Sequence, residues 1–201
     1  MRRDKPSRTA RKVALTVVAL GAKSGMDRIL PPSLVQTTEA LLVASGVVGE
    51  RAVRWSRSQR IVSIYEAFDG ILPGQFEAFA RRKAFCERQV RDGISGGASQ
   101  VIVLGAGYDT MGWRLAPEYP GVIFFEIDHP ATARFKAKGI DEMGQRSNLC
   151  LIAEDLGKQK LVDVLKGHKS WDQKAQTIIV AEGLVMYLGF YPISTDGLET
   201  M

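Results

Sequence analysis

QVIVLGAGYDT, residues 100–110, joins a short run of β-branched and other apolar residues to a turn that contains two glycines. Further apolar runs of the same kind follow at 122–127, 149–153 and 177–181. Short continuous runs of this composition are typical of strands that are buried on both faces of a parallel sheet. The second half of the chain is therefore predicted to contain four such strands.

Segments with helical character lie between these runs. We expect helices at 110–115, 131–143 and 159–166. Strands that alternate with helices imply right-handed βαβ units. The predicted fold class is therefore α/β, with a doubly wound, Rossmann-like sheet.

The first half of the chain has helical periodicity instead. Four helices are expected, at 8–23, 34–45, 51–67 and 75–91, and Gly93, Gly96 and Gly97 are expected to stop the last one. This pattern predicts an N-terminal helical region at 1–96 that packs on the sheet. A Rossmann-like half at 97–188 and a divergent tail at 189–201 would follow it.

Composition restricts the class of protein. The 201 residues are 45% hydrophobic and 24% charged, which is ordinary for a globular domain. The net charge of +5 favours anionic ligands without indicating nucleic acid, and no apolar run approaches the roughly 20 residues of a membrane span. Two cysteines and two histidines provide neither a zinc site nor a disulfide framework. We therefore expect a cytoplasmic protein without a metal, nucleic-acid or membrane partner. A competing pattern is the basic N-terminus followed by the apolar residues 13–22, which together loosely resemble a signal peptide.

The turn after the first strand is a candidate ligand site. Gly105 and Gly107 allow the backbone to turn tightly and to approach a ligand closely. The third glycine of a dinucleotide fingerprint is replaced by Thr110, and Asp109 places negative charge at the helix start, where a pyrophosphate would bind. A cationic or zwitterionic ligand fits this turn better, and a purely structural turn is the alternative.

Acidic residues follow the other three strands. Asp128 ends the second strand about 20 residues after Gly107, the spacing of a carboxylate that binds ribose hydroxyls, although a helix cap is the alternative. Asp155 and Leu156 follow the third strand and are candidates for contacts with an adenine ring. Glu182 follows the fourth strand and needs a positive partner, either a ligand ammonium group or a nearby arginine.

These stretches together resemble the leucine carboxyl methyltransferase family, in its bacterial branch of S-adenosylmethionine-dependent methyltransferases. The resemblance rests on FARRKAFCERQV, VIVLGAGYDTMGWRLA, FFEIDHPAT, the Asp155-Leu156 pair and AEGLVMYL. It implies S-adenosyl-L-methionine as cofactor and a class I methyltransferase fold. Cofactor-binding roles are implied for the following residues: Arg82, Gly105, Ala106, Gly107, Asp128, Asp155, Leu156 and Glu182. Arg82 would pair with the methionine carboxylate, with Arg81 as the alternative.

The resemblance also implies an activity. Members methylate a carboxylate or another oxygen of a small molecule or protein, and a carboxylate needs no general base because it is ionised at neutral pH. No residue is therefore assigned a catalytic role. The family continues well beyond Leu188, so we expect the C-terminal strands to be missing and the chain to be inactive through truncation. Alternatives are a non-catalytic remnant that dimerises through its exposed sheet edge, and a nicotinamide-dependent oxidoreductase.

Overall fold

The computed structural model describes residues 5–71 and 73–183. Its centre is one parallel sheet of four strands in the order β3-β2-β1-β4. The strands are β1 (Gln100–Leu104), β2 (Ile123–Asp128), β3 (Leu149–Ala153) and β4 (Thr177–Val180). The α/β class and the four predicted strands are thus confirmed, while the predicted tail and the stretch 184–188 lie outside the described residues.

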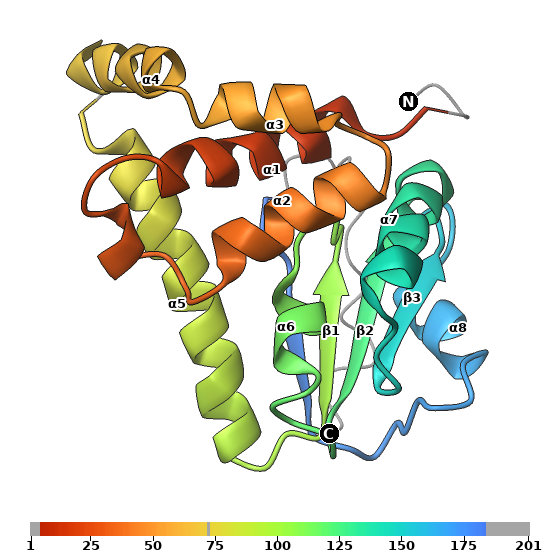
Figure 1. The fold of residues 1–201 in the computed structure, drawn as a ribbon. Coiled ribbons are helices and arrows are strands. Elements are labelled where there is room, and N and C mark those ends of the chain that lie inside the picture. Colours follow the sequence, from red (N-terminus) through yellow and green to blue (C-terminus); the bar gives the residue numbers. More distant parts are fainter. Residues whose placement is uncertain (1–4, 72, 184–201) are drawn as a thin grey trace.

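Helices cover both faces of this sheet, as expected for a doubly wound fold (Figure 1). Val101 and Val103 of β1 point to the face covered by α5 (Gln75–Ser95) and α6 (Met111–Leu115). Ile102, between them, packs on the other face with Leu165 of α8 (Leu161–Lys166). This alternation follows from the two-residue period of a strand. The helix α7 (Pro130–Met143) packs against β2 and β3.

Three N-terminal helices, α1 (Arg8–Gly21), α2 (Leu34–Ala44) and α3 (Glu50–Ser56), lie near the end of the sheet at which the strands finish (Figure 1). The 3₁₀ turn η1 (Met26–Arg28) follows α1, and α4 (Gln59–Ile71) lies away from the sheet, over the start of α5 (Figure 1). Val18 of α1 and Leu41 of α2 share a buried cluster with Tyr108 from the loop after β1. Ser7 caps α1 through a hydrogen bond from the N–H of Ala10 at 3.1 Å. The division of the chain into regions at residues 96 and 97 stays a prediction.

The single helix expected at 51–67 is wrong, because the chain forms two helices there. The N–H groups of Arg57 and Ser58 bond three residues back, to the carbonyls of Arg54 and Trp55, which tightens and ends α3. The carbonyl of Ser58 then accepts from the N–H groups of Ile61 and Val62 and starts α4. Helical periodicity continues across this break, which is why the sequence pattern did not reveal it.

The prediction that Gly93 helps to stop the preceding helix is also wrong. The helix α5 continues through Gly93 and ends at Ser95. A Cβ at Gly93 would lie 2.6 Å from Cδ1 of Ile178 in β4, so the glycine permits close packing of α5 on the sheet. Sequence alone does not distinguish such a packing glycine from a helix terminator.

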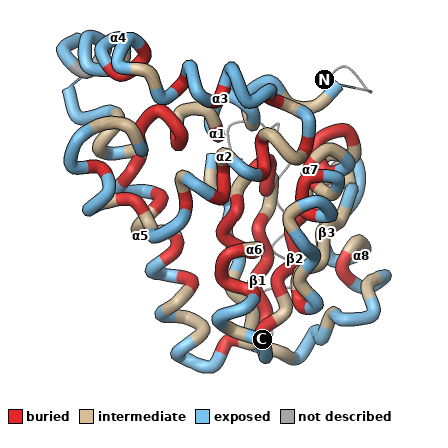
Figure 2. Tube along the Cα trace, viewed as in Figure 1, coloured by how far each residue is buried: buried red, intermediate tan, exposed pale blue. Residues whose placement is uncertain are grey.

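Burial is greatest in the two central strands, as Figure 2 shows in red. By contrast, α4 is mostly exposed along its length (Figure 2). Among residues 5–71 and 73–183, no helix combines the length and the apolar character that a membrane crossing requires. The core therefore surrounds β1 and β2, and the loops that follow these two strands begin next to well-buried residues.

Candidate functional site

The loop after β1 is shaped by its two glycines. Gly105 and Gly107 have φ values of 63° and 51°, in the left-handed region that side chains disfavour. The N–H of Ala106 donates to the carbonyl of Ile127 at 3.2 Å, which fixes the loop to β2. A Cβ at Gly107 would lie 3.0 Å from the Cβ of Ala10, so α1 approaches the loop closely.

Asp128 holds this loop from the end of β2. Its Oδ2 accepts the N–H of Gly107 at 2.5 Å, and its Oδ1 accepts the N–H of His129 at 2.6 Å. Burial raises the pKa of the Asp128 carboxyl, and the two N–H groups partly offset this effect. The alternative role of Asp128 as a helix cap is not what the structure shows, because Nδ1 of His129 accepts the N–H of Ala131 at the start of α7.

Asp155 lies next to this position, after β3. The carbonyl of Asp128 accepts the N–H of Glu154 at 3.0 Å, and Oδ2 of Asp155 lies 3.9 Å from Nε2 of His129. Burial opposes ionisation of Asp155, but the N–H of Gly157 and the ammonium group of Lys158 together outweigh this effect and lower its pKa. The structure thus places Asp155 beside Asp128 at the same end of the sheet.

Leu156 has a different environment. It packs against the buried cluster of β1, β2 and α8, which includes Ile102 and Phe125. Its predicted contact with an adenine ring remains untested.

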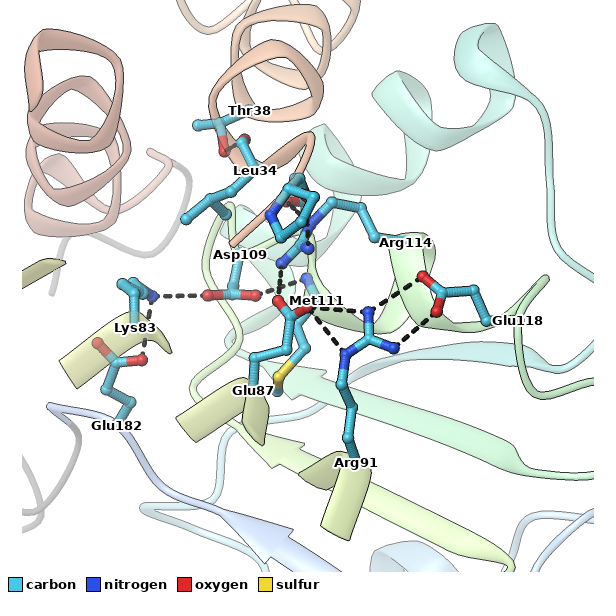
Figure 3. A network of polar contacts seen from close by, with 12 residues as sticks. Leu34, Thr38, Lys83, Glu87, Arg91, Asp109, Met111, Arg114, Glu118 and Glu182 are labelled. Carbon is cyan, nitrogen blue, oxygen red and sulfur yellow. Dashed lines mark hydrogen bonds and ion pairs between the residues drawn. The ribbon is translucent and has the colours of Figure 1, made fainter. Parts of the chain in front are cut away.

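A buried ammonium group joins the loop after β1 to the end of β4 (Figure 3). Nζ of Lys83, on α5, lies 2.6 Å from Oδ2 of Asp109 and 3.0 Å from Oε2 of Glu182. The side chains of all three are at most 17% exposed. Oε1 of Glu182 also accepts a hydrogen bond from Nε of Arg82 at 2.9 Å. Glu182 therefore has internal cationic partners, one of the two possibilities that the sequence left open.

The three charges stabilise one another. Burial disfavours the charged form of Lys83, but Asp109 and Glu182 outweigh this effect and raise its pKa above the ordinary value. Burial likewise opposes ionisation of Asp109, yet Lys83 lowers the pKa of its carboxyl. Asp109 thus places a carboxylate at the start of α6, as the sequence predicted. Its charge is balanced by Lys83, and its Oδ1 accepts the N–H of Met111 at 2.7 Å.

Arg81 and Arg82 differ clearly in position. Arg81 pairs with Glu77 one turn earlier on α5, and its side chain is 66% exposed. Arg82 reaches Glu182, although about half of its side chain is exposed. Of the two arginines that the sequence proposed, Arg82 is thus the one that contacts another predicted site residue.

The sequence profile of leucine carboxyl methyltransferases matches residues 41–190. The chain belongs to the leucine carboxyl methyltransferase family. A relative from Mycobacterium ulcerans (strain Agy99), named "Putative S-adenosyl-L-methionine-dependent methyltransferase", is 28% identical over 145 residues, covering 70% of this chain and 46% of the relative. A protein of the same name from Mycobacterium bovis (strain BCG / Pasteur 1173P2) is 34% identical over 111 residues, covering 54% and 31%. The chain thus spans less than half the length of these relatives.

Lys83 was not among the site residues that the sequence predicted. The buried residues of α5 include Ala80, Lys83, Glu87 and Val90, which are spaced as one helical face. This spacing is a signal that places Lys83 inward and its neighbours Arg81 and Arg82 outward. The signal was hidden because two of the four positions are charged, and charged residues are seldom buried unless they are paired.

A second network, centred on the buried pair of Glu87 and Arg114, joins α5 to α6 (Figure 3). Glu87 lies 2.6 Å from a guanidinium nitrogen of Arg114 and 3.1 Å from one of Arg91. Arg91 also pairs with Glu118 at 2.6 Å. These contacts hold α5 against α6 and so position Lys83 one turn away. No cluster of three or more His, Cys, Asp or Glu side chains suited to a metal occurs at 5–71 or 73–183.

Proposed function

We propose that this chain binds S-adenosyl-L-methionine at the carboxyl edge of its sheet and is the cofactor-binding part of an S-adenosylmethionine-dependent methyltransferase. Family membership supports the class of enzyme. The single observation that carries the site is the row of polar groups along this edge. Asp155, Asp128, the glycine loop and Glu182 follow β3, β2, β1 and β4, which is the spatial order of the strands. In open α/β sheets, ligands bind outside the carboxyl ends of the strands.

The chemistry of these groups fits the parts of the cofactor. Asp128 lies against the loop of Gly105 and Gly107 and would accept hydrogen bonds from ribose hydroxyls, since each carboxylate oxygen has a lone pair left. Asp155 and Leu156 would contact the adenine. Glu182, with its neighbouring cations, would meet the methionine end, which carries both an ammonium group and a carboxylate.

The reaction that we propose is methylation of an oxygen, with a carboxylate of a small molecule or protein as the acceptor. The cofactor supplies a methyl group on a sulfonium centre. An acceptor carboxylate has a pKa of about 4, so it is already ionised at neutral pH and requires no general base. The protein then contributes chiefly by aligning donor and acceptor, an effect worth roughly 7–11 kcal/mol in well-oriented reactions. This proposal assigns no residue a proton-transfer role.

A dinucleotide at the same loop is disfavoured by the local geometry. Oδ1 of Asp109 accepts the N–H of Met111 in the first turn of α6. A pyrophosphate would have to displace this carboxylate from the helix start. The helix α6 also contains only five residues, so its dipole is small.

A non-catalytic protein that dimerises is the second candidate, and the position of β4 at the edge of the sheet favours it. Among the described residues, β4 pairs with β1 on one side and with no strand on the other. Ile179 of this edge strand is 49% exposed. Unpaired apolar edges tend to associate. Light scattering that detects a tight dimer, from protein that binds no cofactor, would support this candidate.

Titration calorimetry tests the proposal on the purified chain. We expect S-adenosylmethionine and S-adenosylhomocysteine to bind at one site per chain, and NADH not to bind. Folded protein that gives no heat with either adenosyl ligand contradicts the proposal. Heat with NADH alone would instead favour the oxidoreductase.

A further inference from the structure

We propose that the outer sides of α3 and α4 form a surface that binds an anionic lipid bilayer. The two helices follow one another along the outside of α1 and both contact it, so their opposite sides face away from the protein (Figures 1 and 2). The α3–α4 surface consists of six exposed residues: Arg51, Arg54, Trp55, Arg60, Ile64 and Ile71. None of them has a place in the proposed cofactor site.

The helix α4 carries an apolar stripe on its exposed side. The members of this stripe recur at intervals of three or four residues, as Arg60, Ile64, Ala67 and Ile71. Residues with this spacing share one face of a helix. Ile64 is 53% exposed and Ile71 is 73% exposed. The buried side of α4 is a different one, at Val62, so packing among the described residues does not account for the stripe.

The helix α3 adds cations and a tryptophan to the same surface. Arg51, Arg54 and Trp55 are three and four residues apart, so they share one side of α3. The buried residues of this helix, Val53 and Ser56, lie on the other side. Trp55 is 61% exposed. A tryptophan ring suits the border between a membrane and water, because it is largely apolar but carries one N–H donor.

The charges of the α3–α4 surface favour an anionic partner. Arg51, Arg54 and Arg60 provide three exposed guanidinium groups. Of the exposed carboxylates nearby, Glu50 stands in the first turn of α3, where it complements the helix dipole. Glu66 is two residues from the nearest isoleucine of the stripe and therefore lies on another side of α4. Phosphate groups would complement the three cations.

A bilayer fits this surface better than a second copy of the chain or a nucleic acid. A second copy would bring the arginines of two such surfaces toward one another, which like charges oppose. A nucleic acid would pair with the arginines but leave the exposed isoleucines in water. A helix at a membrane surface uses both, since its cations meet the headgroups and its apolar side chains enter the acyl boundary by about 5–10 Å. Binding of this kind requires no membrane-spanning segment.

Vesicle flotation with the purified chain tests the inference. We expect the protein to float with vesicles of phosphatidylglycerol and phosphatidylcholine in equal amounts, and not with phosphatidylcholine alone. Each arginine near an anionic surface strengthens binding about fivefold, so Arg51→Gln combined with Arg54→Gln should weaken it about 25-fold. Added salt should weaken binding of the wild-type protein as well, because it screens the charges.

The apolar stripe needs a separate pair of variants. Ile64→Ser combined with Ile71→Ser should weaken binding by about tenfold or more, because it removes the apolar area that enters the bilayer. Phe85→Ser combined with Arg88→Gln is the matched control. It changes an exposed ring and an exposed arginine on α5, outside the α3–α4 surface, and should bind as wild type does. Circular dichroism should show native folding in all of these variants, since every position is exposed.

Fluorescence quenching by brominated lipids reports the orientation of the bound protein. We expect anionic vesicles that contain these lipids to quench the wild-type protein. Trp55→Phe should lose most of this quenching, because Trp113 and Trp171 are partly buried and belong to other parts of the fold.

Several results would overturn the inference. They are folded wild-type protein that does not float with the anionic vesicles, equal flotation with neutral vesicles, and a control variant that loses as much binding as the arginine pair. A dimer in light scattering that Ile64→Ser combined with Ile71→Ser dissociates would also overturn it, because a second copy would then cover the surface. Cofactor binding, measured by calorimetry, is independent of each of these results.

Discussion

Nζ of Lys136 lies 2.6 Å from Oε2 of Glu126, and the two side chains are at most 2% exposed. The same ammonium group donates to the backbone carbonyl of Asp109 at 2.5 Å. Lys136 therefore joins α7, the middle of β2 and the loop that carries Asp109. Burial raises the pKa of the Glu126 carboxyl, while Lys136 counteracts this effect. This interaction therefore fixes the backbone of the loop that carries Asp109 to the sheet and to α7.

Replacing Lys136 by methionine should destabilise the fold strongly. The change leaves Glu126 buried without its cationic partner, and removal of one member of a buried pair typically costs about 3–5 kcal/mol. Urea denaturation at neutral pH measures the free energy of unfolding. Lys138→Met, at an exposed position on the same helix, is the control and should change it by less than about 0.5 kcal/mol. Similar losses in both variants would contradict the role given to the ion pair.

Asp109 should make stability depend on pH in the acidic range. Its folded pKa is lowered, chiefly by Lys83 against the opposing effect of burial, so the unfolded chain binds the proton more readily. The contribution to stability is fully present above the unfolded pKa of about 4 and decreases as the pH falls below it.

Asp109→Asn isolates this contribution. The variant should be less stable than wild type at neutral pH, and the difference should shrink as the pH falls from about 5 toward 2. Urea denaturation at a series of pH values provides the test. A difference that is constant over this range would show that the charge of Asp109 does not contribute.

Gly139→Ala should weaken the contact between α7 and α2. The added Cβ would lie 2.8 Å from Cδ1 of Leu41 and 3.0 Å from the backbone nitrogen of Ser45. Overpacking of this kind costs about 1–3 kcal/mol. Gly70→Ala is the matched control, because no described atom beyond its chain neighbours and the nearby backbone of α4 lies within 4 Å of its Cβ position. The control should be neutral or stabilising by up to about 1 kcal/mol. Thermal unfolding that ranks the two variants in the opposite order would refute this packing.

Asp128→Ala should reduce the affinity for S-adenosylhomocysteine. The carboxylate both accepts the N–H of Gly107 and, under the proposed function, binds the ribose hydroxyls. Loss of hydrogen bonds to a charged group predicts a dissociation constant about 10- to 100-fold higher. Asp141→Ala, at an exposed position whose side chain accepts a hydrogen bond from Gln145, should bind as wild type does. If the two variants bind S-adenosylhomocysteine with equal affinity, Asp128 does not contribute to cofactor binding.

Sequence patterns predicted the sheet better than they predicted the helical region. The run at 100–104 matches β1 residue for residue, because continuous β-branched residues have few alternatives to a buried strand. The helix break near Ser58 and the continuation of α5 through Gly93 were not predictable in the same way. The continuation of α5 depends on the close approach of two distant residues, Gly93 and Ile178. The break near Ser58 consists of local hydrogen bonds that helical periodicity does not reveal.

In the candidate site, too, some residues were predictable from the sequence and others were not. The acidic residues after the strands were recognisable, because parallel strands place their carboxyl ends along one edge. Lys83 was not, since a charged residue on a helix is usually exposed. It became evident only when Asp109 and Glu182, from separate loops, were seen to meet its ammonium group.

A crystal structure of the chain with S-adenosylhomocysteine tests the central claim most directly. We predict that the ribose hydroxyls lie within hydrogen-bond distance of the Asp128 carboxylate and that the methionine end lies beside Glu182. Density for the ligand away from the carboxyl ends of the strands would contradict the account.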